Sequence, residues 1–151
     1  MQEIASEPQR FMVASWRLYR GFLNTAASRL DRQLGLSVRE VFVLKRISSG
    51  LRHPGQLGEA LDLPSHTTSR VLDPLVKAGL IKRVLDEGDA RRVLLSLTPE
   101  GEERLSAAAT EWEDEAARLL ERLPAERRAA FLADLETIAG PRDARGKGER
   151  P

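Results

Sequence analysis

The chain has 151 residues, of which 41% are hydrophobic and 31% charged, and this composition is typical of a soluble globular protein. It contains no cysteine, which excludes disulfides, thiol redox switches and thiolate metal sites. No run approaches the roughly 18 consecutive apolar residues of a membrane-spanning helix, and residues 1–9 lack the pattern of a signal peptide. We therefore expect a cytoplasmic protein with no membrane partner.

The net charge of +1 hides an uneven distribution along the chain. Residues 36–98 hold ten Lys and Arg against seven Asp and Glu, whereas residues 99–139 hold five against eleven. A basic segment beside an acidic one suits a protein that presents one face to a polyanion. Ordinary solvated helix faces explain the same counts equally well, so charge alone leaves both interpretations open.

Two helices are predicted in the first third of the chain. From about residue 8 to residue 34, apolar residues recur at spacings of three and four, and Gly35 stands where a helix C-terminal glycine belongs. Ser37 then begins a second helix, because Glu40, three residues later, completes a capping box.

The next segment has the spacing of a helix-turn-helix. A short helix begins at Pro54, residues 62–64 form a break, and a longer helix runs from near Ser65 to Gly79. Pro74 lies inside this longer helix and lacks a backbone donor. It predicts a kink or a local break near Arg70.

A β-hairpin and two more helices complete the predicted order. Residues 81–85 and 92–97 are aliphatic runs around an Asp- and Gly-rich turn, as in a hairpin. Thr98 and Pro99 supply the N-cap and first-turn proline of the next helix, and Pro124 starts the last one. Residues 140–151 have almost nothing to bury, and we expect them to be disordered.

These elements predict an α+β fold, mostly α: a winged helix-turn-helix with N- and C-terminal dimerisation helices. The DNA-binding lobe would be residues 36–98, and the dimerisation helices would lie in residues 1–35 and 99–139. The flanking helices have broad apolar stripes and the lobe has a small core, so we expect a homodimer in which two copies cover each other's stripes. In the alternative, the two ends of one chain pack on each other.

The order of elements and one motif resemble the MarR family of bacterial transcriptional regulators over residues 8–139. Asp89-Ala90-Arg91 is followed after five residues by Leu97-Thr98, and residues 99–101 continue as in the family. The resemblance implies a repressor that binds pseudo-palindromic duplex DNA as a homodimer. It also implies that Asp89 fixes the wing turn or the Arg91 side chain.

The start of the fourth helix carries the predicted base and phosphate contacts. Short hydroxyl side chains let a helix approach base edges, and an arginine can bond guanine bidentately. The resemblance places DNA contacts on this helix, at positions matched here by Ser65, His66, Thr67, Ser69 and Arg70. Thr68 is expected to face inward. Helix capping accounts for at least one of the hydroxyl groups.

The hairpin tip is expected to reach the adjacent minor groove. Arginine suits a narrow A·T-rich groove, whose negative potential is enhanced. Arg91 is our candidate for this insertion, with Arg92 beside it. In the alternative, both arginines are solvent-exposed side chains of the hairpin that do not contact DNA.

An effector site is predicted on the first helix. The resemblance implies that small aromatic or anionic molecules bind between the dimerisation helices and the DNA-binding lobe. Trp16, Tyr19 and Arg20 offer rings for stacking and a cation for an anionic group. In the alternative, the two rings are ordinary core or dimer-interface residues.

We expect no cofactor, no metal and no enzymatic activity. The two histidines, His53 and His66, lack ligands at a convincing spacing, and His53 is better placed just before a helix start. Neither a nucleophile elbow nor a Gly-rich phosphate loop is present. Two rivals to a DNA-binding regulator remain: a winged-helix protein-interaction module without DNA binding, and a small helical enzyme.

Overall fold

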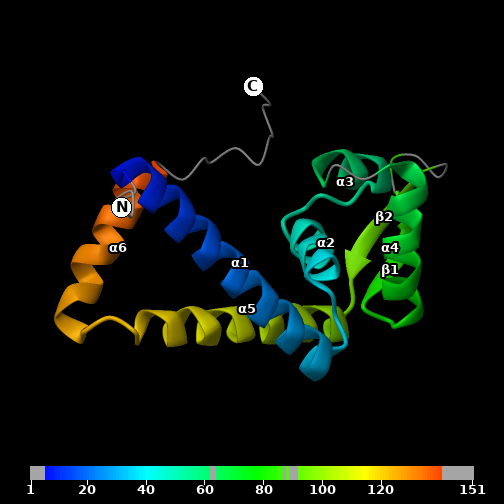
Figure 1. Ribbon diagram of the computed structural model, residues 1–151. Coiled ribbons are helices and arrows are strands. Elements are labelled where there is room, and N and C mark those ends of the chain that lie inside the picture. Colours follow the sequence, from blue (N-terminus) through cyan, green and yellow to red (C-terminus); the bar gives the residue numbers. More distant parts are fainter. Residues whose placement is uncertain (1–5, 62–63, 87, 89–91, 141–151) are drawn as a thin grey trace.

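The computed structural model describes residues 6–61, 64–86, 88 and 92–140, without the side chains of Ser65 and His66. The described residues form a mostly helical α+β fold (Figure 1), which confirms the predicted class. None of the described helices is long and apolar enough to cross a membrane. The elements are α1 (Glu7–Leu34), α2 (Val38–Ser48), α3 (Pro54–Ala60), α4 (Ser65–Lys77), β1 (Ile81–Leu85), β2 (Val93–Leu97), α5 (Pro99–Leu120) and α6 (Ala125–Ala139).

Local side-chain and backbone chemistry sets the helix ends. The Ser37 hydroxyl accepts a hydrogen bond from the Glu40 backbone N–H, and the Glu40 carboxylate accepts one from the Ser37 backbone N–H. Gly35 adopts the left-handed conformation, with φ of 62°, after the last turn of α1. Thr98 caps α5 by accepting a hydrogen bond from the backbone N–H of Gly101. These three predicted boundaries are confirmed.

The predicted break at Pro74 is wrong, because α4 runs without interruption from Ser65 to Lys77. The backbone N–H of Ala78 still donates to the Pro74 carbonyl at 2.8 Å, so the last turn closes normally. The cost is local, since Pro74 merely has no N–H to offer the Arg70 carbonyl four residues back.

One hydrophobic core joins the middle of the chain to its flanking helices. Leu44 of α2, Leu75 of α4, Ile81 of β1 and Leu95 of β2 belong to the same buried cluster. The two strands pair antiparallel, from Ile81 opposite Leu97 to Leu85 opposite Val93. Leu30 of α1 and Ala108 of α5 complete this cluster. The C-terminal half of α1 and the N-terminal half of α5 are therefore anchored to the helix-turn-helix and hairpin.

The outer parts of the flanking helices are less well covered. Figure 1 shows α1, α5 and α6 along three sides of a triangle, with α2–α4 and the hairpin at one end of α5. Ala26 and Leu30 of α1 are fully buried, whereas α6 contains no buried residue. Packing between the two ends of one chain thus covers only part of their apolar stripes. The large side chains left exposed on α1 and α6 include Phe11, Met12, Trp16, Tyr19, Phe131, Leu132, Leu135 and Ile138.

Candidate nucleic-acid interface

The helix α4 has one buried face and one exposed face. Thr68, Leu72 and Leu75 are 5%, 2% and 1% exposed, and their spacing of four and three puts them on one side of the helix. Ser69 and Arg70 are exposed. The apolar face therefore anchors α4 in the core and leaves these two predicted contact residues open to solvent. The inward orientation predicted for Thr68 is confirmed.

The first turn of α4 is organised around the carbonyl of Pro64. This carbonyl accepts from the backbone N–H groups of Thr67 and Thr68 at 2.8 and 2.9 Å. The Thr68 hydroxyl donates to the same carbonyl at 3.3 Å. This bond is not a cap, because the N-cap residue of α4 is Pro64 and it has no side-chain capping bond; the helix capping expected of one hydroxyl is therefore not found among the described side chains. The side chains of Ser65 and His66, two of the predicted contacts, lie outside the described residues.

The hairpin is closed toward its tip by Asp86. Its backbone N–H donates to the Arg92 carbonyl at 3.0 Å, and its carboxylate accepts from the Gly88 backbone N–H at 2.9 Å. This second bond forms an Asx-type turn. Asp86 belongs to the Asp- and Gly-rich turn predicted from the sequence, but the role of fixing that turn was expected only of Asp89. Arg92 is exposed, whereas Asp89 and Arg91 lie outside the described residues.

An ion pair connects the exposed face of α4 to the hairpin. The Arg83 guanidinium of β1 lies 2.7 Å from the Asp73 carboxylate of α4. The two side chains are 50% and 63% exposed, so solvent screens the pair and its contribution to stability is at most about 1 kcal/mol. The sequence analysis missed this pair, because its residues lie on elements of different periodicity.

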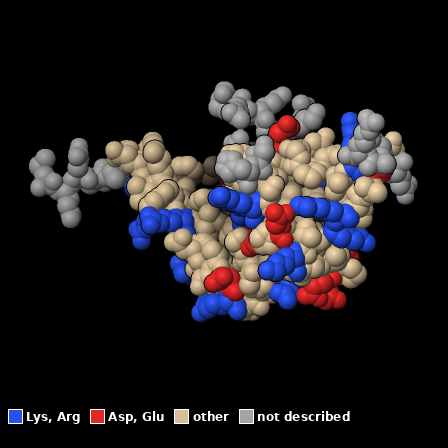
Figure 2. All heavy atoms as spheres, turned by 90° about the vertical axis from the view of Figure 1, so that its right-hand side faces the viewer, with Lys and Arg blue, Asp and Glu red and all other residues tan. Residues whose placement is uncertain are grey.

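Charges of both signs cover this end of the molecule. Figure 2 looks onto the end that carries α2–α4 and the hairpin, and it shows Lys and Arg spread among Asp and Glu. This mixture agrees with the small basic excess counted for residues 36–98. The exposed basic residues of this part of the chain include Arg52, Arg70, Lys77, Lys82 and Arg92.

The helix-turn-helix segment is similar to a known family. Residues 34–92 match the model of the MarR family, and this segment runs from the end of α1 through α2, α3, α4 and β1 to the residue before β2. The match covers less than half of the chain.

Solved structures with a similar fold span the flanking helices as well. Wild-type E. coli MarR in its apo form is 21% identical, with a TM-score of 0.70 over 91% of this chain and 100% of that chain. YusO of Bacillus subtilis is 20% identical, with a TM-score of 0.76 over 89% and 98%. A point mutant of S. aureus MepR, bound to an oligodeoxyribonucleotide, is 20% identical, with a TM-score of 0.69 over 85% and 95%. No curated protein sequence matches the chain.

The structure brings two of the three predicted effector residues together. The Arg20 guanidinium carbon lies 4.9 Å from the centroid of the Trp16 ring, a cation–π arrangement. Trp16 and Tyr19 are 58% and 65% exposed, so neither ring is a core residue within one chain. The core interpretation of these rings is therefore wrong. Their roles at a dimer interface or in an effector pocket stay predictions.

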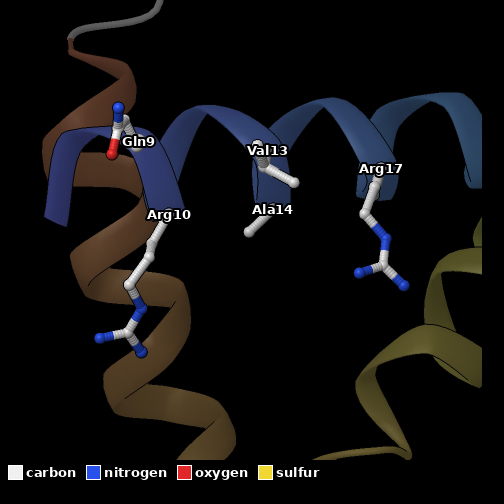
Figure 3. A pocket seen from close by; sticks show the side chains of 5 residues that line it. All are labelled: Gln9, Arg10, Val13, Ala14 and Arg17. Atoms are coloured by element: carbon white, nitrogen blue, oxygen red, sulfur yellow. The ribbon is translucent and has the colours of Figure 1, made fainter. Parts of the chain in front are cut away.

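A hollow of about 610 Å³ lies along the same half of α1 but is formed by other residues. Figure 3 shows Arg10 and Arg17 extending to the same side of the helix, with Ala14 between them. Gln9 and Val13 complete the lining. The hollow is therefore distinct from the predicted set of Trp16, Tyr19 and Arg20.

Of the two histidines, only His53 has a described side chain. In the part of the chain that the structure describes, no group of three or more His, Cys, Asp or Glu residues is placed to hold a metal ion. His53 is the residue before α3, as predicted, and its side chain makes no capping bond.

Proposed function

We propose that the chain is a MarR-type transcriptional repressor that binds pseudo-palindromic duplex DNA as a homodimer. The carrying observation is the orientation of α4, in which Thr68 and Leu75 face the core while Ser69 and Arg70 face solvent. Residues 65–70 would enter the major groove, where short hydroxyl groups and an arginine can reach base edges and phosphates. A structural neighbour, the S. aureus MepR point mutant, was solved bound to an oligodeoxyribonucleotide, which supports this proposal.

The hairpin would act as the wing. Arg91 would enter the minor groove at an A·T-rich step, with Arg92 beside it and Asp89 fixing the tip. The proposal is supported by the short turn that Asp86 closes, and by the Arg83–Asp73 ion pair between β1 and α4. These contacts tie the hairpin to the helix that would lie in the major groove.

Residues 1–35 and 99–139 would form the dimerisation helices, and residues 36–98 the DNA-binding lobe. The exposed rings and aliphatic side chains of α1 and α6 support this division, because extended apolar surface marks an interaction site. Two recognition helices related by twofold symmetry would enter successive major grooves about 34–36 Å apart. The protein would act on promoter DNA in the cytoplasm, and its chemistry would be binding, not catalysis.

A small aromatic or anionic molecule would release the DNA. Trp16 and Arg20 present a ring and a cation together, and Tyr19 lies one turn from Trp16 on the same helix. Binding there would favour a spacing between the two lobes that no longer matches the half-sites.

Fluorescence anisotropy with a duplex from upstream of the protein's own gene tests the proposal. We expect at least about a hundredfold preference over a scrambled duplex, and a clearly negative slope of log affinity against log salt. Sedimentation velocity should show one dimer on each duplex. Equal affinity for both duplexes, or no binding in dilute buffer, would overturn the proposal. Retained function after alanine replacement of residues 65–70 and 91–92 would instead favour a protein-interaction module.

A further inference from the structure

The hydroxyl of Thr98 bonds to two different parts of the fold. It donates to the Gly79 carbonyl at 2.5 Å, and it accepts from the Gly101 backbone N–H at 3.0 Å. The Thr98 backbone N–H also donates to the Leu80 carbonyl at 3.1 Å. Gly79 and Leu80 form the turn between α4 and β1, whereas Gly101 belongs to the first turn of α5. One residue therefore joins the end of α4 to the start of α5.

The backbones on the two sides of Thr98 are in close contact. Gly101 is buried, and a Cβ added to it would overlap the Leu80 carbonyl oxygen. Leu80 is in turn held to α4, because its backbone N–H donates to the Leu75 carbonyl at 2.9 Å. Backbone groups cannot relieve such a contact by changing rotamer. The C-terminal end of α4 and the first turn of α5 are therefore held as one unit.

Beside the apolar packing of Leu30 and Ala108 in the core, the polar contacts between α1 and α5 are made by long side chains. The Arg104 guanidinium donates to the Leu34 carbonyl at 2.6 Å, and Arg29 pairs with Glu111. Arginine side chains have several rotatable bonds and can follow a small shift between two helices. The hydrogen bonds of Thr98 to Gly79, Leu80 and Gly101, which we call the Thr98 joint, lack this freedom. A change in the tilt of α5 (Figure 1) is thus transmitted directly to α4.

We propose that Thr98 is a positioning residue for DNA recognition: it fixes the angle between α4 and α5, and thereby the distance between the two recognition helices of the dimer. This inference rests on the proposed DNA-binding function. Without the bond to the Gly79 carbonyl, α4 can pivot about the turn at residues 78–80, where Gly79 has a φ of 73°. The dimer then no longer holds its two recognition helices at the distance that separates the half-sites of the DNA.

Three variants separate this role from ordinary helix capping. Thr98→Ser keeps both bonds. Thr98→Asp keeps an acceptor for the Gly101 N–H but has no proton to donate to the Gly79 or Leu80 carbonyl, so it retains the cap and loses the side-chain bonds to the turn after α4. Thr98→Val loses both bonds. Thr110→Val is the matched control, because the Thr110 hydroxyl bonds within α5, to the Ser106 carbonyl at 3.3 Å.

Affinity is measured on duplexes with the natural half-site spacing and with one or two base pairs added. We expect the wild type, Thr98→Ser and Thr110→Val to prefer the natural spacing strongly. Thr98→Asp and Thr98→Val should lose about tenfold on the natural duplex and much less on the altered ones, because the helices are no longer held at one distance. The salt slope should stay the same, since no phosphate contact is removed. An unchanged spacing preference in Thr98→Asp would overturn the inference.

Amide hydrogen exchange on the free protein gives a second readout that needs no DNA. Residues 78–81 should exchange faster in Thr98→Asp and Thr98→Val than in Thr98→Ser, while residues 26–34 of α1 stay unchanged. Equal exchange of residues 78–81 in all variants would show that the Thr98 hydroxyl does not hold the turn between α4 and β1. If residues 78–81 exchange faster in these variants but the wild type binds no duplex, the structural role of Thr98 is supported and the DNA-binding proposal is rejected.

Discussion

The Arg29 guanidinium lies 2.5 Å from the Glu111 carboxylate and links α1 to α5. The two side chains are only 18% and 14% exposed, and the residues are 82 positions apart in the chain. Burial of a charge to this extent raises the free energy of the fold unless an opposite charge pairs with it. Each of the two side chains therefore offsets the desolvation of the other. The pair therefore stabilises the contact between α1 and α5.

Replacing Arg29 by Met should lower the free energy of unfolding by about 1–3 kcal/mol, because Glu111 is left covered and unpaired. Urea unfolding followed by circular dichroism measures this change. Arg83→Met is the matched control: its partner Asp73 is 63% exposed, so its loss should cost less than about 1 kcal/mol. Equal effects of the two substitutions would contradict the importance of burial.

Gly101→Ala should destabilise the protein, because the new methyl group would overlap the Leu80 carbonyl oxygen. Overpacking of this kind typically costs about 1–3 kcal/mol. Gly21 in α1 is a suitable control, since a Cβ there meets nothing within 4 Å. Gly21→Ala should be neutral or stabilising by up to about 1 kcal/mol, as expected for an open helix position. Thermal unfolding of both variants at one protein concentration shows whether each substitution stabilises or destabilises the protein.

Arg70→Ala should weaken binding to the cognate duplex by about 1–3 kcal/mol and affect a scrambled duplex less, if the guanidinium bonds a guanine. Anisotropy titrations on both duplexes measure the difference. Arg122→Ala, an exposed arginine beyond the C-terminal end of α5, should leave both affinities unchanged. An identical loss on both duplexes would show that Arg70 contacts phosphates and carries no sequence information.

Arg91→Ala should reduce DNA affinity at least several-fold without lowering the melting temperature. The reduction should be largest on duplexes with A·T-rich flanks, where a narrow minor groove attracts arginine. Arg91→Lys should fall between wild type and alanine, because lysine keeps the charge but not the planar guanidinium. Unchanged affinity in Arg91→Ala would remove this residue from the interface.

Leu135→Asp should convert the homodimer into monomers and abolish DNA binding. Leu135 is 42% exposed on α6 within one chain, and a carboxylate there would be buried without a partner in the proposed interface. Sedimentation velocity gives the mass, with the neighbouring Glu136→Gln as control. A Leu135→Asp protein that remains dimeric would place the interface elsewhere.

The helix boundaries were predictable because the groups that set them lie close together in the sequence. Ser37 and Glu40 cap each other across three residues, and Gly35 needs only its own φ to end α1. The inward face of α4 was likewise readable from the spacing of Leu72 and Leu75, and the inward position of Thr68 was implied by the family resemblance. The break predicted at Pro74 is wrong, because α4 continues past the one backbone donor that this proline removes.

Contacts between distant segments could not be predicted. Arg29 and Glu111 meet only because α1 crosses α5, and no local pattern marks either residue as half of a pair. Thr98 was correctly identified as an N-cap, but its bond to Gly79 depends on how α4 and α5 meet. The same holds for the Arg83–Asp73 ion pair, which needs the hairpin to fold back against α4.

The lack of any buried residue in α6 has a consequence for folding. Helices of about 12–15 residues are only marginally stable in water on their own, and α6 has 15 residues. In the proposed assembly its order therefore comes from the second subunit, so folding of this segment and subunit association are one equilibrium. The melting temperature should then rise with protein concentration, as mass action requires. At high dilution, the C-terminal part of the chain should be the first to lose its helical signal and to be cut by proteases.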